Sequence, residues 1–154
     1  MTRVKLYLED LTPGMRRAYG PVEVTREAII RFARDFDPQP FHLDEEAAHR
    51  SPFGGLVASG WHTASLCMRM VVEGLIAETH MLGSPGADEL RFVKPVRPGD
   101  VLRLNLEVLA VTPSRSKPNL GSVRLRYEAR NQHEEVVLTM IGIGLVARCP
   151  SPDP

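Results

Sequence analysis

The hydrophobic and polar positions follow two different periods along this chain. Between residues 25 and 36, apolar side chains recur at the spacing of a short amphipathic helix, behind Thr25 as a candidate N-cap. The longest helical pattern runs from about Gly60 to about Thr79, and its apolar residues cover most of the circumference. A helix that is apolar nearly all round is typical of a buried one, so this segment is predicted to lie in the core.

Most of the remaining chain alternates with a period of two, which is typical of strands. Five stretches are predicted as strands, namely 18–24, 89–96, 101–108, 123–129 and 135–146. Turn signals separate them, such as the Pro-Gly pair at 98–99. Short helices, one long helix and then a meander predict an α+β fold in which a curved antiparallel sheet of about five strands wraps the long helix.

Length and charge narrow the class of protein. The 154 residues suit a single domain, with a core at about 13–146 and a frayed tail at 149–154. Lys plus Arg and Asp plus Glu are each 19, so a zero net charge gives no bulk attraction to nucleic acid or to a membrane surface. Because the chain has no signal-peptide pattern and no apolar run near about 18 residues, a cytoplasmic protein is predicted.

The residues that commonly hold metals do not cluster in the sequence. The two cysteines, Cys67 and Cys149, form no CxxC pair, and the five histidines show no HExxH spacing. No metal and no cofactor are therefore predicted.

The stretch FDPQPFH places a carboxylate and an imidazole five positions apart. Pro38 and Pro40 end the preceding helix and stiffen the connection, so 37–42 is predicted to be extended or turn-like. Asp37 and His42 are then candidates for joint acid–base work on one water molecule. The alternative is that Asp37 caps the helix end and His42 is an ordinary surface histidine.

A second candidate element, FGGLVASG, leads directly into the long helix. Free backbone N–H groups at a helix start favour negative charge, so Gly60 offers a donor to an oxygen that becomes negative during a reaction. The alternative is a plain helix-start glycine with Ser59 as the cap.

Together these elements resemble the MaoC-like dehydratases, which include the (R)-specific enoyl-CoA hydratases. The motif of that family runs Asp-x-Asn-Pro-x-His, and Asp37, Pro40 and His42 match it position for position. The FGG and A-x-G elements follow at 53–55 and 58–60, and RFVKPVRPGD at 91–100 resembles the family's strand and turn after the long helix. The likeness runs from about residue 13 to about 146, with Gln39 standing where the family has Asn.

The resemblance implies a hot-dog fold that pairs as a homodimer or higher homo-oligomer, with a substrate tunnel near the interface. It implies a lyase of fatty acid metabolism that adds or removes water across the 2,3 double bond of an acyl-CoA or related thioester. Asp37 and His42 would activate the water, and the Gly60 N–H would stabilise the thioester oxygen. The expected substrate-binding residues are Gln39, Phe53, Gly54, Gly55, Ser59, Trp61 and His62.

Several alternatives remain open at this point. Trp61 and His62 are either pocket residues or packed structural ones. Arg91, Lys94 and Arg97 either contact CoA phosphates or occupy solvated strand positions. A hot-dog thioesterase and a non-catalytic acyl-thioester-binding subunit are the competing functions.

Overall fold

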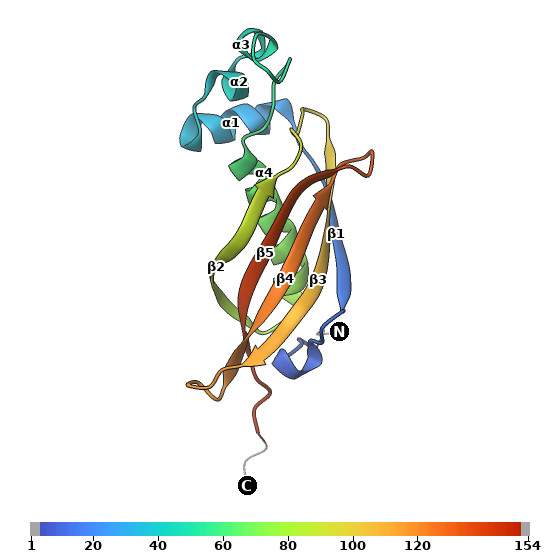
Figure 1. Cartoon of the computed structure of the whole chain (residues 1–154), viewed down its shortest axis with the longest axis vertical. Coiled ribbons are helices and arrows are strands. Elements are labelled where there is room, and N and C mark those ends of the chain that lie inside the picture. The colour runs from blue at the N-terminus through green and yellow to red at the C-terminus, as the bar shows by residue number, and fades with distance from the viewer. Residues whose placement is uncertain (1–3, 152–154) are drawn as a thin grey trace.

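The computed structural model describes residues 4–151 and shows one antiparallel sheet with a long helix packed on one face and short helices at one end (Figure 1). The strands lie in the order β1-β3-β4-β5-β2, and every neighbouring pair is antiparallel. Their bounds are β1 Arg16–Glu23, β2 Met81–Phe92, β3 Val101–Pro113, β4 Leu120–Arg130 and β5 Val136–Ala147. The predicted α+β arrangement of five strands is confirmed.

The long helix is α4, Gly60–Val71, which continues through the π-helical turn η2, Val72–Ile76. The core lies between α4 and the sheet, where Cys67 and Met70 belong to one cluster with buried strand residues such as Leu104 and Leu125. One side of α4 is not covered. Trp61 is 59% exposed, Met68 50% and Val72 45%, so the prediction of burial all round was wrong on that side.

Strand β2 begins eight residues before the predicted residue 89, at Met81. This added part contains Gly83, Pro85 and Gly86, residue types that favour turns. In the structure they lie in an edge strand whose register against β5 shifts at Gly83 and again before Gly86. Bulges and edge strands tolerate glycine and proline, so the strand continues through these three residues.

Three short helices gather at one end of the sheet, and they are α1, Arg26–Phe36, α2, Pro40–Leu43, and α3, Glu45–His49 (Figure 1). Thr25 and Asp44 cap α1 and α3 by accepting from Ala28 N at 3.1 Å and from Ala47 N at 2.7 Å. The segment 37–42 is not wholly extended, because Pro40 begins α2. Proline suits a first helical position, where no N–H is needed.

The two ends of the described chain lie close together. The N-terminal segment forms the 3₁₀ turn η1, Leu8–Asp10. Arg148 Nε and the Cys149 N–H donate to the carboxylate of Glu9 and lower the pKa of Glu9 to about 2. The predicted frayed tail is thus tied down at its first residue, while 152–154 lie outside the described residues. Within residues 4–151, no helix combines the length and apolar character needed to cross a bilayer.

Candidate active site

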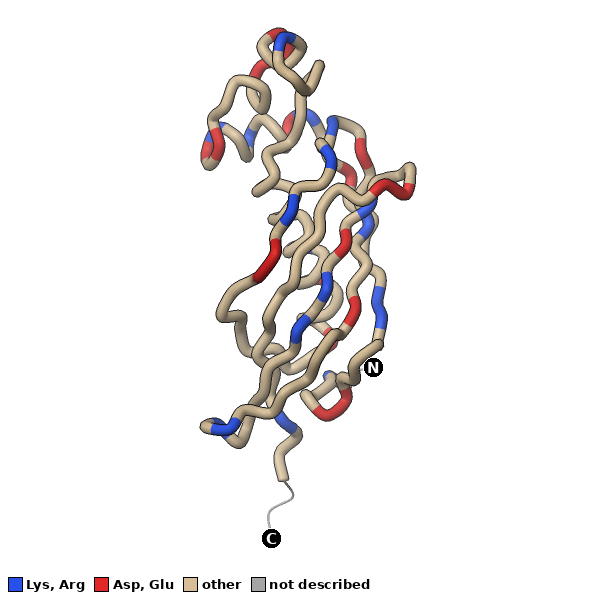
Figure 2. The backbone as a smooth tube through the Cα atoms, in the orientation of Figure 1, with Lys and Arg blue, Asp and Glu red and all other residues tan. Residues whose placement is uncertain are grey.

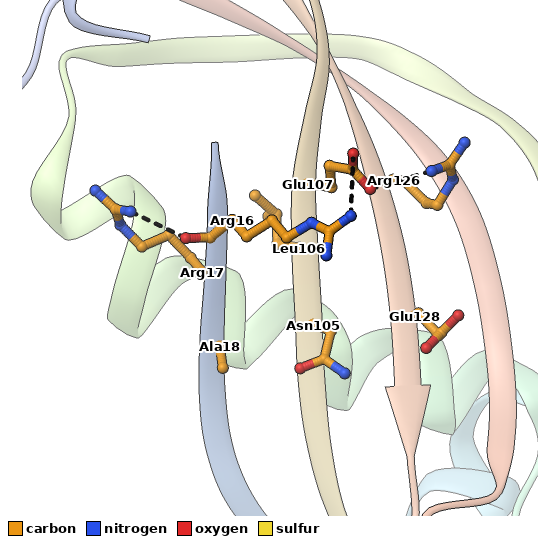
Figure 3. A pocket seen from close by; sticks show the side chains of 8 residues that line it. All are labelled: Arg16, Arg17, Ala18, Asn105, Leu106, Glu107, Arg126 and Glu128. Atoms are coloured by element: carbon orange, nitrogen blue, oxygen red, sulfur yellow. Dashed lines mark hydrogen bonds and ion pairs between the residues drawn. The ribbon is translucent and has the colours of Figure 1, made fainter. Parts of the chain in front are cut away.

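A groove of about 610 Å³ lies on the outer face of the sheet, over β1, β3 and β4 (Figure 3). Lys and Arg residues and Asp and Glu residues are interspersed along the strands of the sheet (Figure 2). Glu107 contacts both Arg16, at 3.8 Å, and Arg126, at 3.1 Å. The described residues that line the groove include no histidine, and its Glu107 carboxylate is engaged in ion pairs, so the groove offers no carboxylate–imidazole pair.

A second hollow, the α4 cavity, lies at the N-terminal end of α4 and has a volume of about 530 Å³. The first part of the chain contributes the residue after α1, helix α2, the 53–58 segment and the start of α4, and the sheet side contributes the end of β2, the segment after it and Val137 of β5. The residues that line it are Asp37, Gln39, Phe41, His42, Phe53, Val57, Ala58, Gly60, Trp61, Thr63, Phe92, Val93, Lys94, Pro95, Val96 and Val137.

The local sequence brings Asp37 and His42 together. Asp37 is the C-cap of α1, where its N–H still bonds Ala33 O at 2.9 Å. The chain then turns into α2, which carries His42 back toward the carboxylate. His42 Nε2 lies 3.3 Å from Asp37 Oδ2, and the two side chains are only 7% and 18% exposed. His42 is therefore a buried partner of Asp37 and not a surface histidine.

The Asp37 carboxylate is held at both oxygens. Gln39 Nε2 donates to Oδ1 at 2.7 Å, and Ser59 Oγ donates to Oδ2 at 2.7 Å. Burial by itself raises the pKa of Asp37, but the hydrogen bonds from Ser59 and Gln39 and the nearby His42 outweigh it, so the net pKa is lowered. Asp37 is thus a fixed carboxylate anion, and the longer Gln39 amide reaches it.

The tautomer of His42 follows from its other contact. His42 Nδ1 lies 2.6 Å from the Val57 carbonyl oxygen. Because a carbonyl only accepts, Nδ1 carries a hydrogen and the lone pair of the neutral ring lies on Nε2. In the neutral ring, His42 Nε2 and Asp37 Oδ2 are therefore two acceptors 3.3 Å apart at the wall of the α4 cavity, and in the protonated ring Nε2 donates to Oδ2.

Gly60 is the first residue of α4. Ser59 caps the helix, since its Oγ accepts from Trp61 N at 3.2 Å. Within residues 4–151 the Gly60 N–H has no hydrogen-bond partner, as expected at a helix start. A Cβ at Gly60 would come within 2.6 Å of Phe92 Cγ, so only glycine leaves room for that ring.

The structure separates the other sequence candidates. Phe53 and Trp61 line the α4 cavity, while the fully buried Ser59 bonds Asp37 from outside the lining. Gly54 and Gly55 do not line it; Gly54, at φ 67°, serves a turn. Sequence reasoning missed five lining residues that come from the sheet or its flanking segments, namely Phe92, Val93, Pro95, Val96 and Val137. No local pattern marks them, because only strand pairing brings them here.

His62 does not line the cavity, and its ring stacks on Phe32 with centroids 4.9 Å apart. It therefore packs α4 on α1, the two helices that carry Gly60 and Asp37. His62 Nδ1 is buried without a hydrogen-bond partner among the described residues, and burial, helped by Arg31, lowers the pKa of His62. The ring therefore stays neutral to a lower pH in the folded protein than in the unfolded chain.

This burial predicts a loss of stability in mild acid. Below about pH 6.5 the unfolded chain protonates His62 while the folded protein resists it. The free energy of unfolding should fall as the pH drops below that value, by at most about 1.4 kcal/mol per pH unit for one proton. Melting curves from pH 7 to pH 5 should show a smaller slope for His62→Phe than for wild type. The same slope in wild type and His62→Phe would contradict this role of His62. His49→Gln, at an exposed position, is the control and should keep the wild-type slope.

Comparison with known proteins points to one family. The model of the MaoC like domain matches residues 10–131. The Bacillus subtilis protein YdeM is 32% identical over 127 residues, which cover 82% of this chain and 89% of that protein. A 3-hydroxybutyryl-CoA dehydratase of Methylorubrum extorquens is 34% identical over 121 residues, 75% of this chain and 72% of the relative.

A crystal structure shows the same fold. The MaoC-like dehydratase from Rhodospirillum rubrum is 44% identical, with a TM-score of 0.85 over 95% of this chain and 99% of its own. The sheet wrapped around α4 is therefore the hot-dog fold.

Proposed function

Since the chain belongs to the MaoC-like domain family, we propose that it adds water to, or removes water from, the 2,3 double bond of a 2-enoyl thioester such as a CoA ester. The observation that carries this proposal is the pair of acceptors, His42 Nε2 and Asp37 Oδ2, 3.3 Å apart in a cavity that also contains Gly60. The name of the Methylorubrum extorquens relative supports a CoA thioester as the substrate.

The geometry supports a mechanism in which the two acceptors orient one water molecule. The water donates one hydrogen to each acceptor, and its oxygen attacks C3 of the enoyl group. The departing proton goes to His42 Nε2, because an imidazole is ordinarily the stronger base and hydrogen bonds further weaken the Asp37 carboxylate as a base. The resulting imidazolium lies beside the Asp37 anion, which stabilises it.

The electrons of the double bond move toward the thioester carbonyl as the new C–O bond forms. The oxygen of that carbonyl becomes negative, and the unpaired Gly60 N–H at the positive end of α4 donates to it. When this charge returns, C2 takes the proton from His42, so one H and one OH have been added. The reverse sequence removes water from a 3-hydroxyacyl thioester.

The walls of the α4 cavity suit an acyl thioester. Phe41 packs edge-on against His42, with centroids 4.5 Å apart, and against Phe53 at 5.2 Å. These rings hold the imidazole in place and give an apolar surface to the acyl chain. Because apolar walls also exclude bulk water, the charges that develop during reaction interact more strongly there.

The test of the proposed function is hydration of crotonyl-CoA and of longer 2-enoyl-CoA homologues, followed by loss of the enoyl-thioester absorbance. Release of free thiol from butyryl-CoA, which has no double bond to hydrate, would identify a thioesterase instead. Tight binding of these esters without turnover would identify a binding subunit. Either result would overturn the hydratase proposal.

We propose further that two copies of the chain pair through β2 and the uncovered side of α4. Strand β2 is a sheet edge, and an unpaired edge is a ready template for another strand. Exposed apolar side chains continue from α4 onto this edge, since Leu82 is 59% exposed and Phe92 49%. A patch of this kind on one face is typical of an interface.

Met68→Glu is expected to weaken this dimer, because it places a charge in the middle of the apolar patch. Light scattering of the eluted protein should give twice the chain mass for wild type and a shift toward the single-chain mass for the variant. Met68→Leu keeps the patch apolar and should behave as wild type. A wild-type protein that elutes as a single chain at all concentrations would contradict the proposal.

A further inference from the structure

Lys94 is the only positively charged side chain among the described residues that line the α4 cavity, and Asp37 is the only negatively charged one. The carboxylate of Asp37 is already engaged with Gln39 and Ser59. Lys94 pairs with a different acid, Glu135, with its Nζ 2.5 Å from Glu135 Oε1. The cavity therefore contains an acid–base pair and, separately, one cation.

The position of Lys94 is set by its surroundings. Just past the end of β2, the N–H groups of Val93 and Lys94 both donate to Val137 O, at 2.8 and 3.4 Å. Glu135, the partner of the ammonium, is itself held by Asn131 Nδ2 at 3.0 Å. The side chains of Lys94 and Glu135 are 50% and 42% exposed. The ammonium is thus held at the solvent-facing rim of the cavity and is not buried inside it.

The Lys94–Glu135 pair leaves capacity for a ligand. An ammonium has three hydrogens to donate, and the pair with Glu135 uses one direction. An exposed ion pair of this kind contributes little to stability, so an incoming anion can share the ammonium at small cost. The neighbouring wall is aromatic, with Phe41, Phe53 and Trp61, and an apolar wall strengthens a contact between opposite charges.

We propose that Lys94 binds an anionic group of the thioester substrate while Asp37 and His42 act on its double bond. This inference rests on the proposed hydratase function, because it assigns the remaining charge of the same cavity. The shared chemistry is an oxyanion, and it has two sources in an acyl thioester. One is a phosphate of the carrier arm, as in CoA, and the other is a carboxylate on the acyl group.

Three thioesters separate these sources. Crotonyl-CoA carries phosphates and a neutral acyl group, and the N-acetylcysteamine thioester of crotonate carries neither charge. The N-acetylcysteamine thioester of fumarate carries a carboxylate on the acyl group and no phosphate. Lys94→Met keeps an unbranched side chain of nearly the same length and removes its charge. Lys117→Met, in the β3–β4 loop and outside the cavity lining, makes the same exchange as a control.

Lys94→Met is expected to raise the KM of one anionic thioester about tenfold and to change kcat by less than about twofold, since the contact is equal in ground and transition states. The neutral thioester should be unaffected, and Lys117→Met should match wild type with all three. A raised KM for crotonyl-CoA would identify a CoA phosphate as the anion that Lys94 binds. A raised KM for the fumarate thioester would identify the acyl carboxylate. Unchanged KM values for both anionic thioesters, or an equal loss with the neutral one, would overturn the inference.

A binding measurement keeps this inference separate from the proposed function. Trp61 is the only tryptophan of the chain and lines the α4 cavity, so its fluorescence reports a ligand there. Titration with butyryl-CoA, and with the N-acetylcysteamine thioester of succinate, needs no turnover. Binding about tenfold weaker in Lys94→Met, in a protein that hydrates nothing, would keep Lys94 as the anion site and reject the hydratase. Hydration of the enoyl thioesters together with equal ligand binding by wild type and Lys94→Met would keep the hydratase and reject Lys94 as the anion site.

Discussion

Asp37→Asn is expected to lower kcat for crotonyl-CoA hydration by about 10³-fold, within the range that positioned acid–base groups contribute. The amide keeps the shape of the side chain but removes the negative charge beside His42. It also replaces one of the two acceptors that would orient the water. The imidazolium that forms during proton transfer would then have no anion 3.3 Å away to stabilise it. KM should change little, because the loss belongs to the transition state.

The matched control for this variant is Asp35→Asn, two residues earlier on α1. Asp35 is exposed, so the control makes the same chemical change on the same helix without touching the cavity. Steady-state kinetics and thermal melting of both variants complete the test. Near-normal kcat in Asp37→Asn would remove the carboxylate from the mechanism. A collapse of the melting transition in that variant alone would instead assign Asp37 a structural role.

The acid–imidazole pair could be predicted from sequence because its geometry is local. Pro38 and Pro40 stop α1 at Asp37, and five residues are too few for His42 to travel far. The same holds for Gly60, whose place at a helix start follows from the apolar pattern behind it. Because the chain that joins these residues to their helix ends is short and stiff, their spacing in the sequence predicts their positions in space.

The sheet side of the cavity could not be predicted, because it depends on contacts between distant segments. Phe92 reaches Gly60 across 32 positions, and Lys94 pairs with Glu135 across 41. Those contacts depend on the register of β2 against β5, which shifts at bulges that no local pattern reveals. The uncovered side of α4 could not be predicted for a similar reason. Periodicity identifies apolar residues such as Met68 but does not show whether another segment packs on them.

Gly60→Ala is expected to lower kcat by about 10²-fold, the usual effect of losing one donor to an oxyanion. The new Cβ would come within 2.6 Å of Phe92 Cγ, and closer still to Cδ2. Either the ring or the first turn of α4 must then move. Movement of that turn takes the Gly60 N–H away from the thioester oxygen. Alanine is the better helix former, so any loss of thermal stability in this variant comes from the clash and not from helix propensity.

The double variant Gly60→Ala/Phe92→Ala isolates this cause. Removing the ring makes room for the Cβ, so part of the lost kcat should return relative to Gly60→Ala alone. Gly55→Ala is the control, because its Cβ would meet only the end of the Arg97 side chain, at 3.3 Å, outside the cavity lining. Unchanged kcat in Gly60→Ala would show that the thioester oxygen does not depend on this N–H. If the double variant has no higher kcat than Gly60→Ala, the clash with the Phe92 ring is not the cause of the lost kcat.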